Sequence, residues 1–156
     1  MTTLHDDVVK AGSMRLARES DRDAVEEIVF AAYEPWVEIV GMRPLPMEAD
    51  YGKLIAEQRV HLMGDIDGLI VLIPEDGALY IDNVAVRPEL HGKGIGRELL
   101  AFAEDEARRL GLPATRLITN VKMLSNRALY ARLGYQEVGF KGVEGRQAVE
   151  MRKELS

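Results

Sequence analysis

Cysteine is absent from the 156 residues of this chain. Its absence excludes a disulfide framework, a zinc site built on thiolates and a cysteine nucleophile, and it suits a reducing compartment. Histidine is scarce as well, and the three histidines are scattered without the spacing of metal ligands, so we expect no metal. No apolar run approaches the roughly 20 residues of a membrane span, and the N-terminal stretch lacks the apolar core of a signal peptide. These absences predict a cytoplasmic protein with no membrane partner.

Positive charge is in deficit, since 20 Lys and Arg residues against 26 Asp and Glu residues give a formal net charge of −6 at pH 7. An acidic chain is a poor general ligand for nucleic acid, so we expect no nucleic-acid partner and a cationic or small-molecule one instead. The length suits a single domain over residues 1–156 that buries a core of its own, with residues 1–12 as a loosely ordered tail.

A basic, glycine-rich stretch opposes this acidic background. The apolar run 79–86 is followed by glycines at 92, 94 and 96, and residues 96–110 have the periodicity of an amphipathic helix. A strand, a glycine loop and a helix present unpaired first-turn amides to an anion, and positive charge is added by Arg87, Lys93 and Arg97. The glycine spacing fits neither the dinucleotide pattern G-x-G-x-x-G nor the phosphate loop G-x-x-x-x-G-K-S/T, so both of those folds are disfavoured.

A second pattern lies downstream, in residues 120–135. Asn126 and Tyr130 stand four residues apart, so both project from one side of a predicted helix. Leu129 and Leu133 hold the adjacent side against the sheet.

Hydrophobic periodicity and turn residues predict the order of the elements. The expected strands are Met14–Glu19, Arg59–Gly64, Gly68–Ile73, Leu79–Val86, Thr115–Asn120, Tyr135–Phe140 and Gln147–Arg152. The expected helices are Asp21–Tyr33 with Ser20 as N-cap, Met47–Glu57, Gly96–Leu110 and Leu124–Leu133, with a loop and a short helical turn over Glu34–Pro46. Because a helix joins strands 79–86 and 115–120, these two should be parallel within a mostly antiparallel sheet.

Residues 91–96 resemble the acyl-CoA pyrophosphate loop of the GCN5-related N-acetyltransferases (GNAT), with His91 where that family usually has Gln or Arg. Residues 120–135 resemble the second signature of the same family, and the order of elements resembles its fold from Met14 onward. The resemblance implies an α/β GNAT fold: a mixed central sheet of six or seven strands flanked by about four helices.

The resemblance also implies acetyl-CoA as co-substrate. Asn126 would bond the pantetheine or phosphate arm, Tyr130 would lie beside the sulfur, and a backbone N–H near a strand irregularity around Val84 would stabilise the oxyanion. The implied cofactor-binding residues are Val84, Ala85, Val86, His91, Gly92, Lys93, Gly94, Ile95, Gly96, Arg97, Asn126 and Tyr130.

Transfer to an amine requires two proton transfers, and each of them indicates a candidate catalytic residue. An ammonium group with a pKa of about 10.4 must lose a proton before it attacks, and the leaving thiolate must gain one. A phenol can supply the second proton, which makes Tyr130 the predicted acid. Asp82 interrupts an apolar strand and is the predicted base, directly or through water, although a bulge would decide its direction; Glu34 and Glu38 are alternatives.

The stretch from Tyr33 to Tyr51 is a candidate wall of the acceptor site. Tyr33 and Trp36 would offer apolar surface, and Arg43 would bind a carboxylate. The alternative is a proline-stiffened loop whose aromatic residues belong to the core. The other candidates also have structural interpretations: the glycine loop as a tight turn without a ligand, Tyr130 as a half-buried helix aromatic, and Asp82 as a bulge residue.

The predicted function is direct transfer of an acetyl group from acetyl-CoA to a primary amine within a ternary complex, because no cysteine is present to carry the group. One alternative is a non-catalytic module of the same fold that binds or senses acyl-CoA. Another is transfer to a hydroxyl, or transfer of a longer acyl group. The acceptor is left open among small amines, amino acids and proteins, and family habit favours a homodimer.

Overall fold

A mixed sheet of seven strands runs through the protein in the order β1-β2-β3-β4-β5-β7-β6. The computed structural model describes residues 13–156, so the predicted tail over residues 1–12 lies outside the described part. The strands are β1 Met14–Leu16, β2 Val60–Met63, β3 Gly68–Glu75, β4 Ala78–Val86, β5 Ala114–Asn120, β6 Gln136–Val143 and β7 Arg146–Glu154. β4 and β5 are parallel and every other pair is antiparallel, which confirms the predicted mixed sheet.

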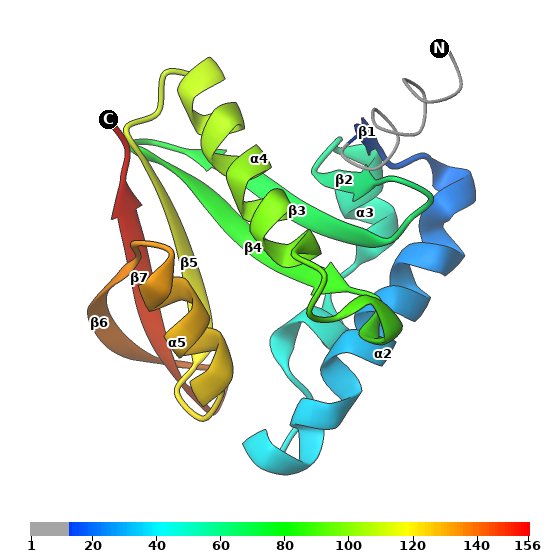
Figure 1. Ribbon diagram of the computed structural model, residues 1–156. Helices are drawn as coiled ribbons and strands as arrows, with labels where there is room; N and C mark the ends of the chain where they lie inside the picture. Colours follow the sequence, from blue (N-terminus) through cyan, green and yellow to red (C-terminus); the bar gives the residue numbers. More distant parts are fainter. Residues whose placement is uncertain (1–12) are drawn as a thin grey trace.

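Helices cover the two faces of this sheet (Figure 1). The α-helices are α2 Arg22–Val40, α3 Tyr51–Ala56, α4 Ile95–Arg109 and α5 Leu124–Arg132, and the short 3-10 turns are η1 Glu19–Asp21, η2 Leu45–Glu48 and η3 Pro88–Leu90. α4 buries Leu99, Leu100 and Ala103 against β3, β4, β5 and β7, and α5 packs at the edge of the same core. α2 and α3 pack against β2, β3 and the end of β4 on the opposite face.

Helix α2 is longer than the sequence predicts. Its expected end at Tyr33 and the expected loop from Glu34 are wrong, because the helix continues through Pro35 to Val40 and ends at Gly41, whose φ is 90°. Proline removes one helical hydrogen bond, yet burial of Val40 continues the apolar stripe beyond it. Ser20 is not the N-cap either, since it lies inside η1, where the Asp21 carboxylate accepts the amide of Arg18 at 2.8 Å.

Two other helix predictions need correction. The expected helix Met47–Glu57 is divided into η2 and α3, because the side chain of Asp50 accepts the amide of Lys53 at 3.1 Å and starts a new helix there. The predicted helix Gly96–Leu110 is α4 Ile95–Arg109; Leu110 is its C-cap residue and is 42% exposed, whereas Ala107 is buried in the core.

A β-bulge in β4 decides which way its side chains point. Val71 pairs with Asn83 and Leu72 pairs with Ile81, so Asp82 is the extra residue, with no partner on β3. Ile81 and Val84 consequently face the core beneath α4, whereas Asn83 and Ala85 face the opposite side, toward α2 and α3.

Buried Asn83 connects three elements through hydrogen bonds. The Tyr33 hydroxyl of α2 lies 2.6 Å from Asn83 Oδ1 and donates to it, and the carbonyl of Val84 lies 3.1 Å from the same hydroxyl. Asn83 Nδ2 donates to the Tyr51 hydroxyl of α3 at 3.0 Å, and Tyr51 donates in turn to the carbonyl of Pro46. The bulge therefore joins α2, α3 and the segment before α3 to β4.

The parallel pair β4 and β5 is joined over only part of its length. Pairing runs from Leu79 with Thr115 to Ile81 with Leu117 and stops there, so residues 82–86 have no partner on β5. The two strands part in the middle of the sheet, at the bulge.

We predict that the Asn83–Tyr51 hydrogen bond contributes measurably to the free energy of unfolding. Asn83→Leu leaves the buried Tyr51 hydroxyl without its donor and should destabilise the protein by about 2 kcal/mol in urea titrations. Tyr51→Phe should cost about 1 kcal/mol, and the double variant should be more stable than the sum of the two losses predicts. Strictly additive losses would mean that the two side chains do not interact.

Candidate functional site

Two adjoining hollows lie where β4 and β5 part. The glycine-loop hollow, of about 320 Å³, is formed by the end of β4, residues 90–97 and α5. The strand hollow, of about 80 Å³, is formed by β4, β5, the start of β7 and the segment before α3. Both hollows share the lining residues Tyr33, Val84, Asn126 and Tyr130. A ligand that fills the first hollow can therefore reach the second beside these four residues.

The glycine loop has the conformation of an anion site. Gly92 and Gly94 have φ values of 82° and 83°, which favour glycine, and Gly94 is the residue from which α4 starts. No side chain caps this helix, and no described residue accepts the first-turn amides of residues 95–97. Gly96 has no positive φ, and a Cβ there would meet nothing within 4 Å, so a ligand can approach this backbone closely.

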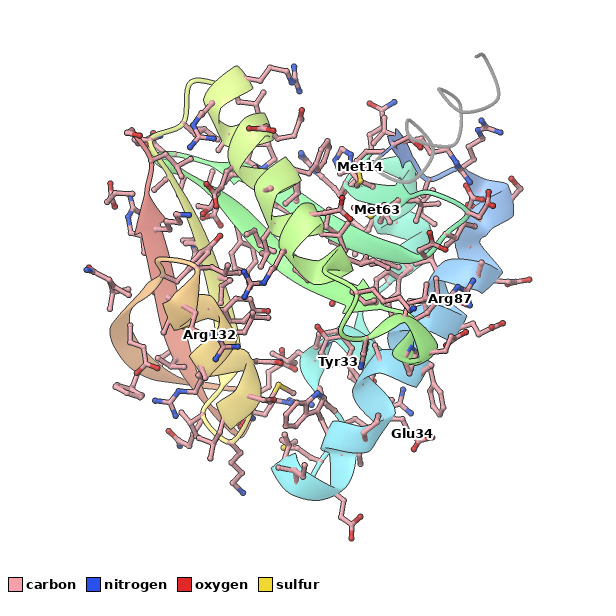
Figure 2. The ribbon with its side chains drawn as sticks, in the orientation of Figure 1. Met14, Tyr33, Glu34, Met63, Arg87 and Arg132 are labelled. Carbon is pink, nitrogen blue, oxygen red and sulfur yellow. The ribbon has the colours of Figure 1, made fainter. Side chains whose placement is uncertain are left out.

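The basic residues around this loop divide into two groups. Arg87 donates to the carbonyl of Ile66 at 2.7 Å and lies 3.8 Å from Glu27, so it joins the β2–β3 turn to α2 (Figure 2). Lys93 and Arg97 form no ion pair with any residue that the structure describes, and Arg97 lines the glycine-loop hollow. His91 is exposed, lines the same hollow and lies with Nε2 3.3 Å from the carbonyl of Val86. Ile95, Ala85 and Val86 complete this wall.

Tyr130 and Asn126 project from α5 into the junction of the hollows. The Tyr130 ring packs edge-on against Tyr135 at 5.9 Å, and burial raises the pKa of Tyr130 to about 12. Its hydroxyl has no hydrogen-bond partner within residues 13–156. Asn126 lies 3.6 Å from the sulfur of Met123, leaving its carbonyl oxygen without a described donor.

The bulge brings Asp82 into the strand hollow. Burial raises the pKa of its carboxyl group, and no described residue forms a hydrogen bond or ion pair with it. The other two acidic candidates, Glu34 and Glu38, lie on exposed positions of α2. Figure 2 shows Tyr33 on the side of α2 that faces the sheet and Glu34 pointing away from it.

The predicted acceptor residues are not brought together. Tyr33 lines both hollows, and its pKa is raised well above the ordinary value, chiefly by burial and then by Tyr130 and Tyr51. Trp36 and Arg43 line neither hollow. Arg43 forms an ion pair with Glu48 at 3.0 Å, so its charge is already balanced.

Sequence reasoning missed two polar residues of this region. Asn83 holds Tyr33 in place from the side of the sheet opposite α4, and Arg146 lines the strand hollow from the start of β7. Arg146 donates to the carbonyl oxygens of Arg43 and Glu144. Neither residue belongs to a recognisable motif, and both are brought to the site by the bulge and by the insertion of β7 beside β5.

Two features are absent from residues 13–156. No group of three or more His, Asp or Glu side chains is arranged to hold a metal ion. No helix in that range combines the length and the apolar character that crossing a membrane requires.

The geometry fits an acyl-CoA. The uncapped helix start, the Cβ-free backbone and two unpaired cations suit a pyrophosphate, and the unpaired edge of β4 suits an amide-containing arm. The far end of that arm would lie beside Tyr130 and Asn126, where the strand hollow begins.

Known proteins are similar to parts of this sequence. Aminoalkylphosphonate N-acetyltransferase of Salmonella typhimurium is 41% identical over 61 residues, which are 39% of this chain and 40% of that protein. IAA acetyltransferase of Azospirillum brasilense is 38% identical over 78 residues, which are 50% of this chain and 51% of that protein. The chain therefore matches only about half or less of the length of these curated relatives.

Solved structures share the fold over nearly the whole chain. PaiA N-acetyltransferase from Thermoplasma acidophilum, in complex with coenzyme A, superposes with a TM-score of 0.76 over 92% of this chain and 98% of its own, at 15% identity. The ribosomal-protein-S18-alanine N-acetyltransferase from Escherichia coli superposes with a TM-score of 0.70 over 92% of this chain and 94% of its own, at 20% identity. At these identities the likeness concerns the fold.

The family follows from a third comparison. The sequence pattern of the acetyltransferase (GNAT) family matches residues 15–135, which contain both motifs, the bulge and the parted strands. The chain therefore belongs to the acetyltransferase (GNAT) family.

Proposed function

We propose that the protein is an acetyl-CoA-dependent N-acetyltransferase that transfers the acetyl group directly to a primary amine in a ternary complex. The observation that carries the proposal is the meeting of the two hollows at Tyr33, Val84, Asn126 and Tyr130. One hollow suits a phosphate-bearing donor and the other is open to an acceptor, so donor and acceptor can be bound together. The acetyltransferase names of both partial relatives, one of them an N-acetyltransferase, support the same reaction class.

The glycine-loop hollow would hold the donor. The free amides of residues 95–97, with Lys93 and Arg97, would bind the pyrophosphate, and His91 and Gly92 would border it. The backbone of Val84, Ala85 and Val86, which has no strand partner on β5, would bind the amide groups of the arm. Asn126 would offer its free carbonyl oxygen to the same arm.

Bound acetyl-CoA would supply a thioester, whose C–S bond is replaced by a new C–N bond to the acceptor. An amide of the unpaired β4 edge near Val84 would donate to the carbonyl oxygen as negative charge develops there. Asp82, facing the acceptor in the strand hollow, would take the proton that the ammonium group loses, directly or through one water. Tyr130 would give its proton to the departing sulfur, and water would return the proton from Asp82 to Tyr130.

A cytoplasmic location and a homodimeric state belong to the same proposal. The first rests on a composition free of cysteine, and the second on the family resemblance alone. A carrier cysteine has no place in the reaction because this chain contains none.

Gly94→Glu should weaken acetyl-CoA binding. The new carboxylate would stand at the N-terminus of α4, where it repels phosphate, so we expect the dissociation constant measured by calorimetry to rise at least about 10-fold. Gly77→Glu is the matched control, because Gly77 also has a positive φ of 85° and open space around it but lies in the β3–β4 turn. Equal weakening in both variants would contradict a phosphate site at the glycine loop.

Tyr130→Phe should lower kcat by roughly 100-fold or more while leaving acetyl-CoA affinity unchanged, because it removes only the proton donor. Release of coenzyme A thiol gives the rate, and calorimetry gives the affinity. Tyr80→Phe is the control, since burial also raises the pKa of Tyr80 to about 12 but the residue lines neither hollow. A Tyr130→Phe enzyme with full kcat would remove this residue from the mechanism.

Asp82→Asn should lower kcat/KM and remove the acid limb from the pH profile of kcat/KM. The raised pKa of Asp82 means that the active, ionised form appears above the ordinary carboxyl value of about 3.9, so wild-type kcat/KM should rise through that higher range. The same shift means that ionised Asp82 opposes folding above its own pKa, so the variant should melt at a higher temperature at pH 7.

Three matched variants assign the base. Asp76→Asn removes an exposed carboxylate from the β3–β4 turn and should leave the pH profile unchanged. Glu34→Gln and Glu38→Gln should do the same if Asp82 is the base. Loss of the acid limb in either glutamate variant, with the limb kept in Asp82→Asn, would transfer the role to that glutamate.

A further inference from the structure

Arg146 carries a positive charge that no carboxylate within the described residues balances. It lines the strand hollow and is half-buried, and none of the ion pairs within residues 13–156 includes it. Its described partners are neutral carbonyl oxygens, Arg43 at 3.1 Å from Nε and Glu144 at 3.0 Å from Nη1. A half-buried guanidinium that faces a hollow and lacks a counter-ion is a natural site for an anion.

The fork of Arg146 keeps donors for such an anion. A guanidinium has five N–H groups, and the contacts with the carbonyl oxygens of Arg43 and Glu144 occupy three of them. These contacts also fix the orientation of the guanidinium group, so less side-chain conformational entropy is lost when a ligand binds. One N–H on each terminal nitrogen is left for a ligand.

The rest of the strand hollow sharpens the choice of ligand. Asp82 is the only acidic residue among its described lining residues and Arg146 the only basic one. The rest of the wall is mainly apolar, with Pro44, Leu45, Pro46, Ile118, Met123 and Val143, and it includes the neutral polar residues Thr119, Asn120 and Asn126. The hollow is also small, at about 80 Å³. A compact molecule with a cationic end, an apolar middle and an anionic end matches this arrangement.

The register of the strands separates the two charges. Asp82 follows Ile81, which pairs with Leu117. Arg146 precedes Ala148 by two residues, and Ala148 pairs with Asn120; because β7 is antiparallel to β5, Arg146 lies past the end of β5. The two backbones are therefore about four residues apart along the strand direction, or roughly 13 Å at about 3.3 Å per residue. Because β5 lies between β4 and β7, they are also two strand spacings, or roughly 10 Å, apart across the sheet, before the long arginine side chain shortens the gap. An amine placed at Asp82 would carry its anion several bonds away.

We propose that Arg146 recognises an anionic group of the acceptor, and that the acceptor is a small primary amine carrying a carboxylate or a phosphonate at its other end. The inference rests on the proposed acetyltransferase function and names the acceptor class of that site. Arg146 is a specificity-determining residue, because it binds the end of the acceptor that does not react.

The test compares acceptors that differ only in the anion. γ-Aminobutyrate is paired with butylamine, and aminopropylphosphonate with propylamine, and thiol release is followed with wild type, Arg146→Gln and Arg146→Lys. For wild type, we expect kcat/KM to be at least about 10-fold higher for the anionic member of a pair, through KM. Arg146→Gln should remove that preference, and Arg146→Lys should restore part of it. The carboxylate and phosphonate pairs show which anion is preferred.

Controls separate recognition from structure. Arg152→Gln removes another arginine of β7 that lines neither hollow, and should keep the wild-type preference. Because Arg146 also holds the carbonyl of Arg43, a structural role alone would lower the rates with neutral and anionic amines by the same factor, and that result would overturn the inference.

Three further outcomes distinguish this inference from the proposed function. Equal use of neutral and anionic amines by wild type would overturn the inference and leave the acetyltransferase function standing. Binding of acetyl-CoA without turnover of any of the four amines would overturn the small anionic acceptor. Failure to bind acetyl-CoA at all would overturn the proposed function itself.

Discussion

The parting of β4 from β5 is the constraint on which the rest of the structure depends. After Ile81 meets Leu117 the two parallel strands stop pairing, and residues 82–86 have no strand partner on the side toward β5, although residues 83–86 still pair with β3 on the other side. Such groups need other partners, since an unpaired buried amide or carbonyl is costly. Side chains satisfy part of the need, because the Tyr33 hydroxyl lies near the Val84 carbonyl and His91 near that of Val86. The remaining edge is available to a ligand.

The bulge at Asp82 makes this parting useful for chemistry. If the same sequence formed a regular strand without the bulge, Asn83 would share a face with Ile81 and point beneath α4, and Val84 would point away from α5. With it, Asn83 turns toward α2 and α3 and fixes Tyr33, while Asp82 enters the strand hollow. Asn83 bonds Tyr33, which lines both hollows, and Tyr51, which donates to the carbonyl of Pro46 in the strand hollow. The side-chain amide of Asn83 therefore positions residues of both hollows. Donor and acceptor sites are thus built on a common support.

The sequence predicts well what depends on local pattern. The spacing of Gly92 and Gly94 and the residues around them predict a strand-to-helix loop. In the structure both glycines have a positive φ. Features that depend on packing cannot be predicted in this way. The sequence predicts a helix that ends before Pro35, yet burial of Val40 extends α2 past this proline. Arg146 belongs to no motif, and reaches the strand hollow only because β7 is inserted between β5 and β6. The position of the bulge is likewise a property of the pairing of β3 with β4.

Charge adds a final constraint on how this acidic chain can bind an anion. A net charge of −6 repels a polyanionic donor at long range, but at physiological salt that repulsion is screened over about 8 Å. Within that distance local charges decide, and the structure uses its cations unevenly. Arg116 of β5 and Arg127 of α5 form ion pairs with carboxylates of the sheet, whereas Lys93, Arg97 and Arg146 have no ion pair among the described residues. The unpaired cations at the glycine loop and the strand hollow therefore offset the acidic background where an anion would bind.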